Sequence, residues 1–410
     1  MLAALLTLAL LAAQPVERVV ALRVQGNTLT PDADVIQMAG IEPGTELTPT
    51  TIADITARLK KAGRFERVEV MKRYASIADL SQVLLVIVVD EGRVVVKPMT
   101  DGQPARTVRR RGPPLMVLPL LGYPEGYGFT YGALVTLPNI AGPRTRLSLP
   151  LTWGGERRAG AEIEKRLDTP RLTRFLVGGS FLDRENPAYD ASDVRRQTWV
   201  RGEREVARAL RLGAWAGFDA VSFEGNDSRL VRTGVDAALD TRVDPMLSRN
   251  AVYIRGALER LDILDEGAPL RALIDANGYI GGPGPITIAV RAYRDGANEA
   301  VPPYLKVLLG RDSTLRGVPS GVAAGDTTAA GTVELRMPIT SPLDIAKLGV
   351  RAFVDAATVY DAGEHLQDQH FDRSVGGGVW VTLTVIRVAL DVARDSRGTV
   401  RVQVNSGLLF

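Results

Sequence analysis

From residue 115 to residue 410, hydrophobic side chains recur at every second position in one short segment after another. Successive side chains of a β-strand point to opposite faces, so this period of two gives each segment one apolar and one polar face. The pattern is clearest in residues 147–153, 210–218, 286–291 and 386–392. Sixteen strand-sized segments fit into this part of the chain, and each has room for the roughly 9–11 residues of a tilted membrane strand and a short connection.

No segment approaches the roughly 20 consecutive apolar residues that a membrane-spanning helix needs. A membrane protein without such helices must close its sheet into a barrel, because lipid offers no hydrogen-bond partner to an open sheet edge. A soluble β-sandwich would also alternate, but it gives no reason for an export segment, a preceding α+β domain or a chain that ends on a strand. We therefore predict a mostly β protein with a 16-stranded antiparallel transmembrane β-barrel at residues 115–410.

Residues 2–13 are almost wholly apolar and end in small residues before Gln14 and Pro15, so that residues 1–14 form one N-terminal segment. Such a stretch is too short to span a bilayer and predicts the core of a signal peptide, with a buried N-terminal helix as the alternative. Its usual basic residues are missing, which leaves an upstream start codon open. The chain has no cysteine, which excludes disulfides and is compatible with the periplasm. A net charge of +3 is too small to indicate nucleic-acid binding.

Residues 16–92 have the pattern of a small α+β domain in the order β-α-α-β-β. The expected elements are a strand at 19–24, helices at 31–40 and 49–62, and strands at 65–73 and 80–89. Residues 93–114 are expected to form a linker that carries the basic cluster Arg106, Arg109, Arg110 and Arg111. This cluster is either a solvated hinge or a segment attracted to anionic lipid at the membrane face.

Three phrases follow one another near the end of the chain: LRGVPSG, GTVELRMP and RAFVDAATVY. Glycine and proline mark the first as a loop tip, whereas the other two alternate like strands. The polar faces of these two strands carry Glu334 and Asp355. The loop carries Arg316, whose guanidinium can make paired hydrogen bonds to a carboxylate if the loop folds back into the barrel.

Together these phrases resemble the BamA/TamA superfamily of outer-membrane assembly and translocation barrels. In its members an arginine–glycine loop motif, usually followed by an aromatic residue, tucks into the lumen and precedes strands of the type S/T-x-E-L-R-x-P and F-x-D-x-G. This chain has Val318 at the aromatic position and Ala357 where glycine is usual. The resemblance implies a loop latch formed by Arg316, Gly317, Glu334 and Asp355. The β-α-α-β-β unit likewise resembles a POTRA domain, the periplasmic module that precedes the barrel in this superfamily.

The strand pattern also predicts a weak seam where the first and last strands meet. The first strand is interrupted by Pro119 and closed by Gly122, and the last contains Gly407 and ends at Phe410. The terminal strand resembles the signal by which outer-membrane barrels are recognised for insertion. The resemblance implies that the seam opens sideways and pairs with a client strand. A merely irregular first hairpin is the alternative.

In the small domain, the strand at 65–73 is a possible exposed edge. Its candidate client-binding residues are Arg67, Val68, Glu69, Val70 and Met71. Such an edge suits capture of an extended client by strand addition. An edge blunted by charge against aggregation explains the same residues.

The resemblance implies an insertase or translocase of the bacterial outer membrane, with its POTRA-like domain in the periplasm. The expected partners are outer-membrane lipid, an unfolded or extended client polypeptide and accessory periplasmic proteins. A passive pore is the alternative, although a pore for small solutes has no use for a POTRA-like domain. A lipid-handling or enzymatic barrel is less favoured, because His365 and His370 lack metal-pair spacing and no serine lies in a triad pattern. No catalytic residue, metal or cofactor is expected.

Overall fold

The computed structural model describes residues 16–27, 30–48, 50–65, 67–76, 79, 81–91, 95–97, 106–108, 115–123, 126–245, 247–264, 266–310, 314–340, 346–383 and 386–408. The chain splits into two compact units, Met1–Pro114 and, for the most part, the residues from Leu115 onward. The expected signal peptide, Phe410 and most of the expected linker lie outside the described residues.

The first unit has the predicted element order. Its elements are β1 (Arg18–Gln25), α2 (Asp32–Ala39), α3 (Thr51–Lys61), β2 (Arg67–Tyr74) and β3 (Gln82–Asp90). Helix α2 ends where Gly40 adopts the left-handed conformation, which costs glycine little. Both helices bury aliphatic side chains against β3, and Ile55 and Leu85 are among the fully buried ones. Burial of this apolar face stabilises the domain without any disulfide.

Strand β3 lies at the centre of the small sheet, parallel to β1 and antiparallel to β2. The outer side of β1 is partly covered, because Val19 N–H donates to the Thr45 carbonyl at 2.9 Å and Leu47 N–H donates to the Glu17 carbonyl at 2.8 Å. Within the described residues, no strand pairs with the outer side of β2. Strand β2 is therefore the open edge of this sheet.

The segment expected as a plain linker contains two short strands. They are β4 (Val95–Lys97) and β5 (Arg106–Val108), which pair antiparallel. The sequence analysis missed them because three residues are too few to show alternation.

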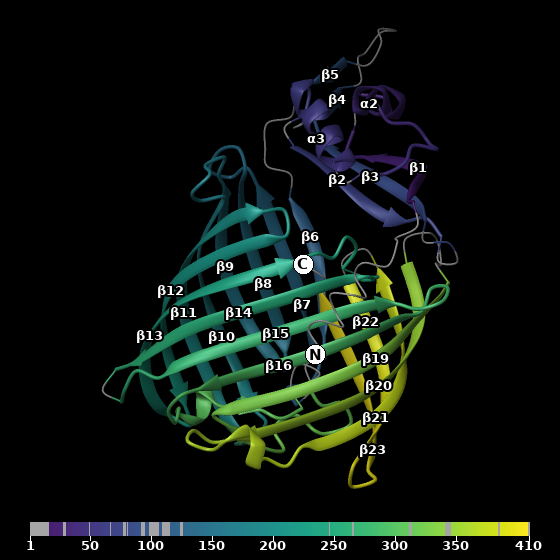
Figure 1. Cartoon of the computed structure of the whole chain (residues 1–410). Coiled ribbons are helices and arrows are strands. Elements are labelled where there is room, and N and C mark those ends of the chain that lie inside the picture. Colours follow the sequence, from purple (N-terminus) through teal and green to yellow (C-terminus); the bar gives the residue numbers. More distant parts are fainter. Residues whose placement is uncertain are drawn as a thin grey trace. The chain divides into compact units, whose positions relative to one another are not determined.

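The second unit is a 16-stranded sheet in which each strand pairs antiparallel with the next, as predicted. Its strands are β6 (Met116–Gly122), β7 (Thr130–Pro138), β8 (Thr145–Gly154), β9 (Glu156–Arg166), β10 (Arg174–Asn186), β11 (Ala191–Ala207), β12 (Leu210–Phe223), β13 (Asn226–Asp240), β14 (Ala251–Ile263), β15 (Leu270–Gly281), β16 (Thr287–Ala297), β19 (Thr327–Thr340), β20 (Ala346–Tyr360), β21 (Asp372–Leu383), β22 (Ile386–Asp395) and β23 (Val400–Leu408). Figure 1 shows these strands tilted and wrapped around a common axis. The strands β6 and β23 come together, which closes the wall.

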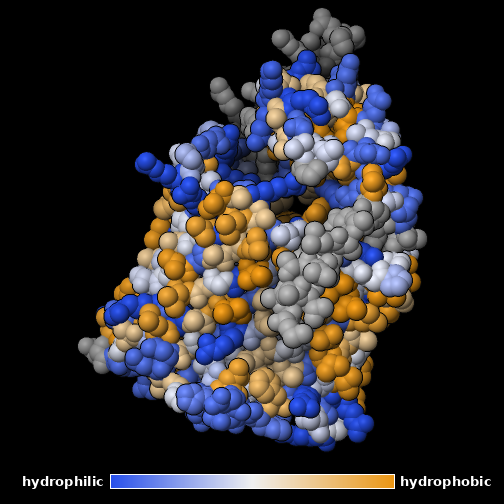
Figure 2. All heavy atoms as spheres, in the orientation of Figure 1, coloured by the Kyte–Doolittle hydropathy of each residue, from blue (hydrophilic) through white to orange (hydrophobic). Residues whose placement is uncertain are grey.

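The two faces of the wall differ as the alternation predicts. Aliphatic residues point outward and are half exposed, for example Val235 at 56%, Ile274 at 53% and Val333 at 53%. Figure 2 shows hydrophobic residues gathered over the outer surface of the barrel and hydrophilic ones at its lower edge. An apolar outer band with a polar interior is the arrangement of a transmembrane barrel.

Among the described residues, no helix is long and apolar enough to cross a membrane.

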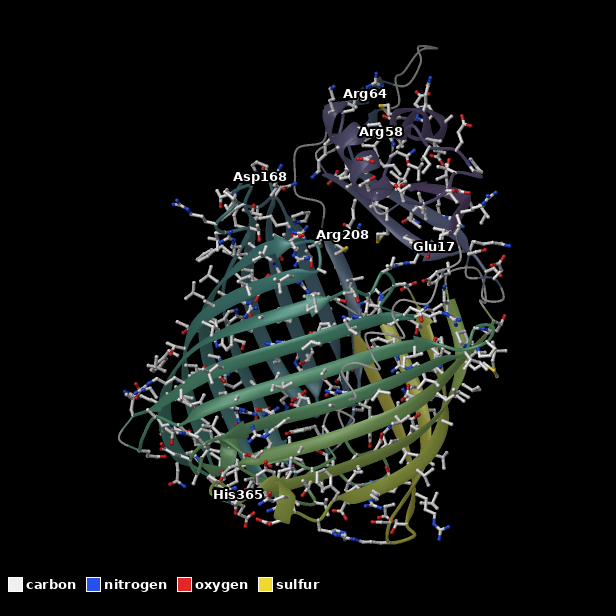
Figure 3. All side chains as sticks on the ribbon, viewed as in Figure 1. Glu17, Arg58, Arg64, Asp168, Arg208 and His365 are labelled. Atoms are coloured by element: carbon white, nitrogen blue, oxygen red, sulfur yellow. The ribbon has the colours of Figure 1, made fainter. Side chains whose placement is uncertain are left out.

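Connections leave the barrel at two ends according to strand parity. Figure 3 shows Asp168 and Arg208, which follow β9 and β11, at one end, and His365, which follows β20, at the other. The short helix η4 (Leu366–Asp368) lies in the connection after β20. The long connection between β16 and β19 leaves at the same end as His365, and it contains η1 (Pro303–Leu305) and the paired strands β17 (Val307–Leu308) and β18 (Ala324–Gly325).

One expectation about the first strand is wrong. Pro119 does not interrupt β6, which runs through it with Pro119 opposite Ala133. Proline lacks a donor but fits an extended backbone, so a strand at the end of a ladder tolerates it. Gly122 is the last residue of β6, as expected.

Candidate functional site

The connection between β16 and β19 folds back along the inner wall, and its tip is held by an apolar cluster. Leu315 is fully buried there, and it packs with Leu309, Val318 and Ala357. Val318 and Ala357 are the two positions at which the chain departs from the motifs quoted above, and the structure brings them into the same cluster. Aliphatic side chains thus pack at the place where the quoted motif has an aromatic one.

Arg316 lies at the centre of the tip with only 4% of its surface exposed. Its Nε and Nη2 donate to the two carboxylate oxygens of Asp355 at 2.8 Å each, and its backbone N–H donates to Oδ2 at 3.1 Å. Nη1 donates to Glu334 Oε2 at 2.5 Å. The guanidinium carbon lies 3.4 Å from the ring centroid of Phe353, which is a cation–π contact. Fork-shaped pairing with a carboxylate is the strong geometry for an arginine.

The two carboxylates have different surroundings. Glu334 also accepts from Arg336 Nε at 2.6 Å and has Arg351 Nη1 at 3.8 Å, whereas Asp355 is fully buried against Arg316. Arg351 in turn pairs with Asp391 on β22. Glu334 is therefore shared between strands and loop, and Asp355 is the main partner of the loop.

Gly317 and Val318 contact the last two strands, β22 and β23. Gly317 has φ +87°, and a Cβ at this position would lie 2.9 Å from the Cβ of Ala393 on β22. Its N–H donates to Gln403 Oε1 on β23 at 2.9 Å, and Gln403 Nε2 donates to the Val318 carbonyl at 3.2 Å. A side chain at Gly317 would be both strained and crowded, so the tip requires glycine here.

The same connection is fastened a second time, at η1. The Tyr304 ring lies 6.2 Å from that of Phe223 on β12, and Arg195 Nη2 donates to the Tyr304 carbonyl at 2.5 Å. Sequence analysis missed this anchor, because nothing in the local pattern around Tyr304 indicates its distant partners.

At the seam, β23 is paired with β22 as far as Leu408, and Gly407 lies opposite Arg387 in that ladder. On its other side β23 comes close to β6, but within the described part of the chain no ladder of hydrogen bonds joins the two. Side chains of residues 405–410 lie outside the described set. The structure places Pro119 and Gly122 on β6 and Gly407 on β23, the two strands that border the seam.

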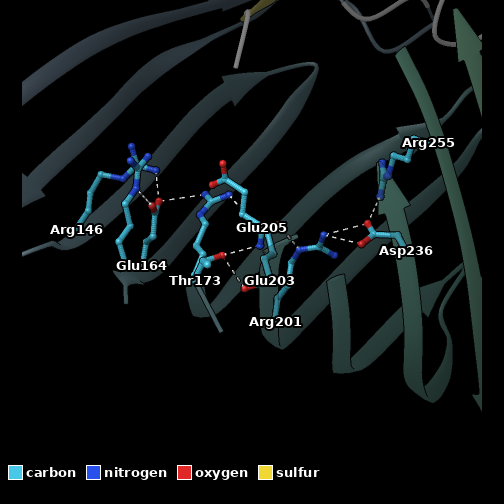
Figure 4. A network of polar contacts seen from close by, with 10 residues as sticks. Arg146, Glu164, Thr173, Arg201, Glu203, Glu205, Asp236 and Arg255 are labelled. Atoms are coloured by element: carbon cyan, nitrogen blue, oxygen red, sulfur yellow. Dashed lines mark hydrogen bonds and ion pairs between the residues drawn. The ribbon is translucent and has the colours of Figure 1, made fainter. Parts of the chain in front are cut away.

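The inner wall carries a chain of alternating charges. Arg174 donates to Glu203 and to Glu164, each at 3.1 Å, and Arg201 donates to Asp236 at 2.9 Å. Figure 4 shows this network, which extends to Arg146, Glu164, Arg201, Glu203, Asp236 and Arg255. Each of these four arginines thus has a carboxylate partner on its own or a nearby strand, so their charges are paired inside the wall.

The candidate edge of the small domain lies on β2. Val68 is buried in the domain core and Val70 packs against it, whereas Glu69 is exposed. Met71 is half-buried, and the Arg67 side chain lies outside the described set. The side chains of Val68 and Glu69 thus point to the domain core and to solvent in turn, as the alternation of a strand requires.

Within the described residues, no group of three or more histidine, cysteine or acidic side chains is placed to hold a metal ion. His365 and His370 are exposed in the connection after β20.

Comparison with known proteins agrees with this architecture. Residues 18–92 match the family described as "POTRA: Surface antigen variable number repeat". Among solved structures, the chain is similar to BamA from Haemophilus ducreyi lacking POTRA domains 1–3, with 16% identity, TM-score 0.60, and coverage of 97% of this chain and 86% of that one. It is also similar to CdiB from Escherichia coli, with 10% identity, TM-score 0.54, and coverage of 98% and 92%.

CdiB from Acinetobacter baumannii is a further structural match, with 10% identity, TM-score 0.51, and coverage of 96% of this chain and 73% of that one. No curated protein matches the sequence significantly. At these identities the structural matches establish the fold, and the match over residues 18–92 identifies the small domain. The chain therefore has the fold of the BamA and CdiB structures, with a POTRA domain at residues 18–92 followed by a 16-stranded barrel.

Proposed function

We propose that this protein is an insertase or translocase of the bacterial outer membrane that assembles or exports client polypeptides. The observation that carries the proposal is the combination of a POTRA domain with a BamA-like barrel. The edge position of β2 and the lack of a ladder between β6 and β23, both found among the described residues, support it, because strand edges of this kind can pair with an extended client. In this proposal Arg316 fixes the loop while the seam opens.

The proposed location has a direct test. The full chain is expected in the outer-membrane fraction as a heat-modifiable band, because a closed barrel resists detergent until boiling. Unboiled and boiled samples should migrate differently on a gel. Recovery of the protein as a soluble periplasmic monomer would contradict this location.

The role of the POTRA edge is testable by proline substitution. Backbone N–H groups of neighbouring strand residues point to opposite sides, so of Glu69 and Val70 one donates toward β3 and the other toward the open edge. The two variants are Glu69→Pro and Val70→Pro. The one that removes the N–H pointing to the open edge should reduce client affinity about tenfold or more while the domain stays folded. The one that removes the N–H pointing to β3 should unfold the domain. Val68, the other candidate position, is unsuitable because it lies in the core.

The measurement is binding of an unfolded outer-membrane barrel polypeptide to the full protein in lipid vesicles. Glu69→Ala is the matched control, since it removes the side chain and keeps the N–H. Equal binding by the outward proline variant and the native chain would mean that the edge serves only to prevent aggregation.

The function itself is tested in vesicles that contain the purified full chain. An unfolded client barrel is expected to become protease-resistant several-fold faster there than in empty vesicles. Ion conductance without any acceleration of client folding or export would favour the passive pore instead.

A further inference from the structure

Gln403 lies on β23, and its side chain faces the lumen with 5% of its surface exposed. This single amide accepts a hydrogen bond from Gly317 N–H and donates one to the Val318 carbonyl. Both loop groups are buried, so water cannot replace the amide without opening the contact. Sequence analysis gave no reason to single out Gln403.

Small residues allow this approach. Gly317 lies against Ala393 of β22, which is 2% exposed, and neither residue has bulk to hold the loop backbone away from the wall. The tip consequently reaches β23 across β22. A larger side chain at either position would push the tip away from Gln403.

The loop tip therefore contacts four of the last five strands of the barrel. Arg316 contacts β19 through Glu334 and β20 through Asp355, while its neighbours contact β22 and β23. Strand β23 is laddered to β22 on one side only, within the residues described. Gln403 thus adds hydrogen bonds from the loop tip, on the lumen side, to β23, the strand that borders the seam.

We propose that Gln403 is a positioning residue that couples the arginine loop to the last strand. Strand β23 can leave the wall only by releasing Gly317 and Val318, and the tip can withdraw only by releasing β23. Coupling of this kind acts equally in both directions. The role of this coupling in seam opening rests on the proposed function. The coupling itself joins two parts of this chain and can be measured without a client.

Hydrogen exchange of the full chain in lipid vesicles tests the coupling. Gln403→Met keeps the length of the side chain and removes both hydrogen bonds. Amides of residues 314–318 and 400–404 should then exchange about tenfold faster or more, because buried backbone groups lose their partners. Val402→Ala is the control, since Val402 points outward from the same strand with 62% exposed, and it should leave the loop tip unchanged.

The reverse perturbation gives an independent readout. Arg316→Ala should speed exchange in residues 400–404. In the double variant with Gln403→Met, the increase should be smaller than the sum of the two single effects on the free energy of opening. The inference fails if Gln403→Met leaves the loop tip unchanged or if Arg316→Ala leaves β23 unchanged. If Gln403→Met does not fold, Arg316→Ala alone decides. A barrel that shows this coupling but handles no client would sink the proposed function and leave the coupling intact.

Discussion

Arg316→Ala is expected to lower the free energy of unfolding of the barrel by about 3–5 kcal/mol and to abolish most client handling, without preventing membrane insertion. The guanidinium is 4% exposed, and its removal takes from the fully buried Asp355 its main partner, whereas Glu334 keeps Arg336. A buried carboxylate without its cation is costly. The measurement is the temperature at which the unboiled gel band disappears, together with the client-folding assay.

An exposed ion pair on the same barrel provides the control. Arg260 and Asp262 lie 3.7 Å apart with about half of each side chain exposed, at 55% and 52%. Arg260→Ala should therefore change stability by only about 0–1 kcal/mol. Equal effects of Arg260→Ala and Arg316→Ala would mean that the loop pair is not a buried latch.

A charge swap identifies the partner. Arg316→Asp and Asp355→Arg should each impair function, and the double variant should recover part of it, because Asp355 makes the two-pronged contact. Glu334 has Arg336 as a second partner, so a swap with Glu334 should rescue less. Better rescue through Glu334, or a silent single variant, would show that the latch is assigned to the wrong carboxylate.

A covalent lock across the seam is expected to stop client insertion almost completely, and reduction should restore it. The chain contains no cysteine, so cysteines placed in pairs on β6 and β23 form the intended crosslink without competition. Opening requires these two strands to separate, since the other neighbours in the barrel are joined by ladders.

The matched control is a pair of cysteines across β12 and β13, which are hydrogen-bonded along their full length. Crosslinks there should leave activity unchanged, because no opening is proposed between these strands. Full activity of the oxidised seam variant would exclude lateral opening as a step of the mechanism.

The sequence carries the architecture because alternation is a property of the local backbone. A period of two fixes which side chains share a face, and so the strand parity places Glu334 and Asp355 on the same side as the other polar residues of the wall. Phe353 shares that face, two residues from Asp355, so the same parity could have indicated its contact with Arg316. The three motifs that contain Arg316, Glu334 and Asp355 follow one another in a fixed order along the chain, and this order indicated the latch, which periodicity alone does not.

Other features depend on how the sheet closes. The partner of Gln403 is set by the path of a loop more than eighty residues away along the chain, and the partner of the Tyr304 carbonyl, Arg195, lies 109 residues away. Which edge of the POTRA sheet stays open is likewise decided by residues 44–47 crossing β1. Periodicity determined the faces of the strands, whereas closure of the barrel and the path of its loop determined which residues on those faces meet, because contacts between distant segments leave no local pattern.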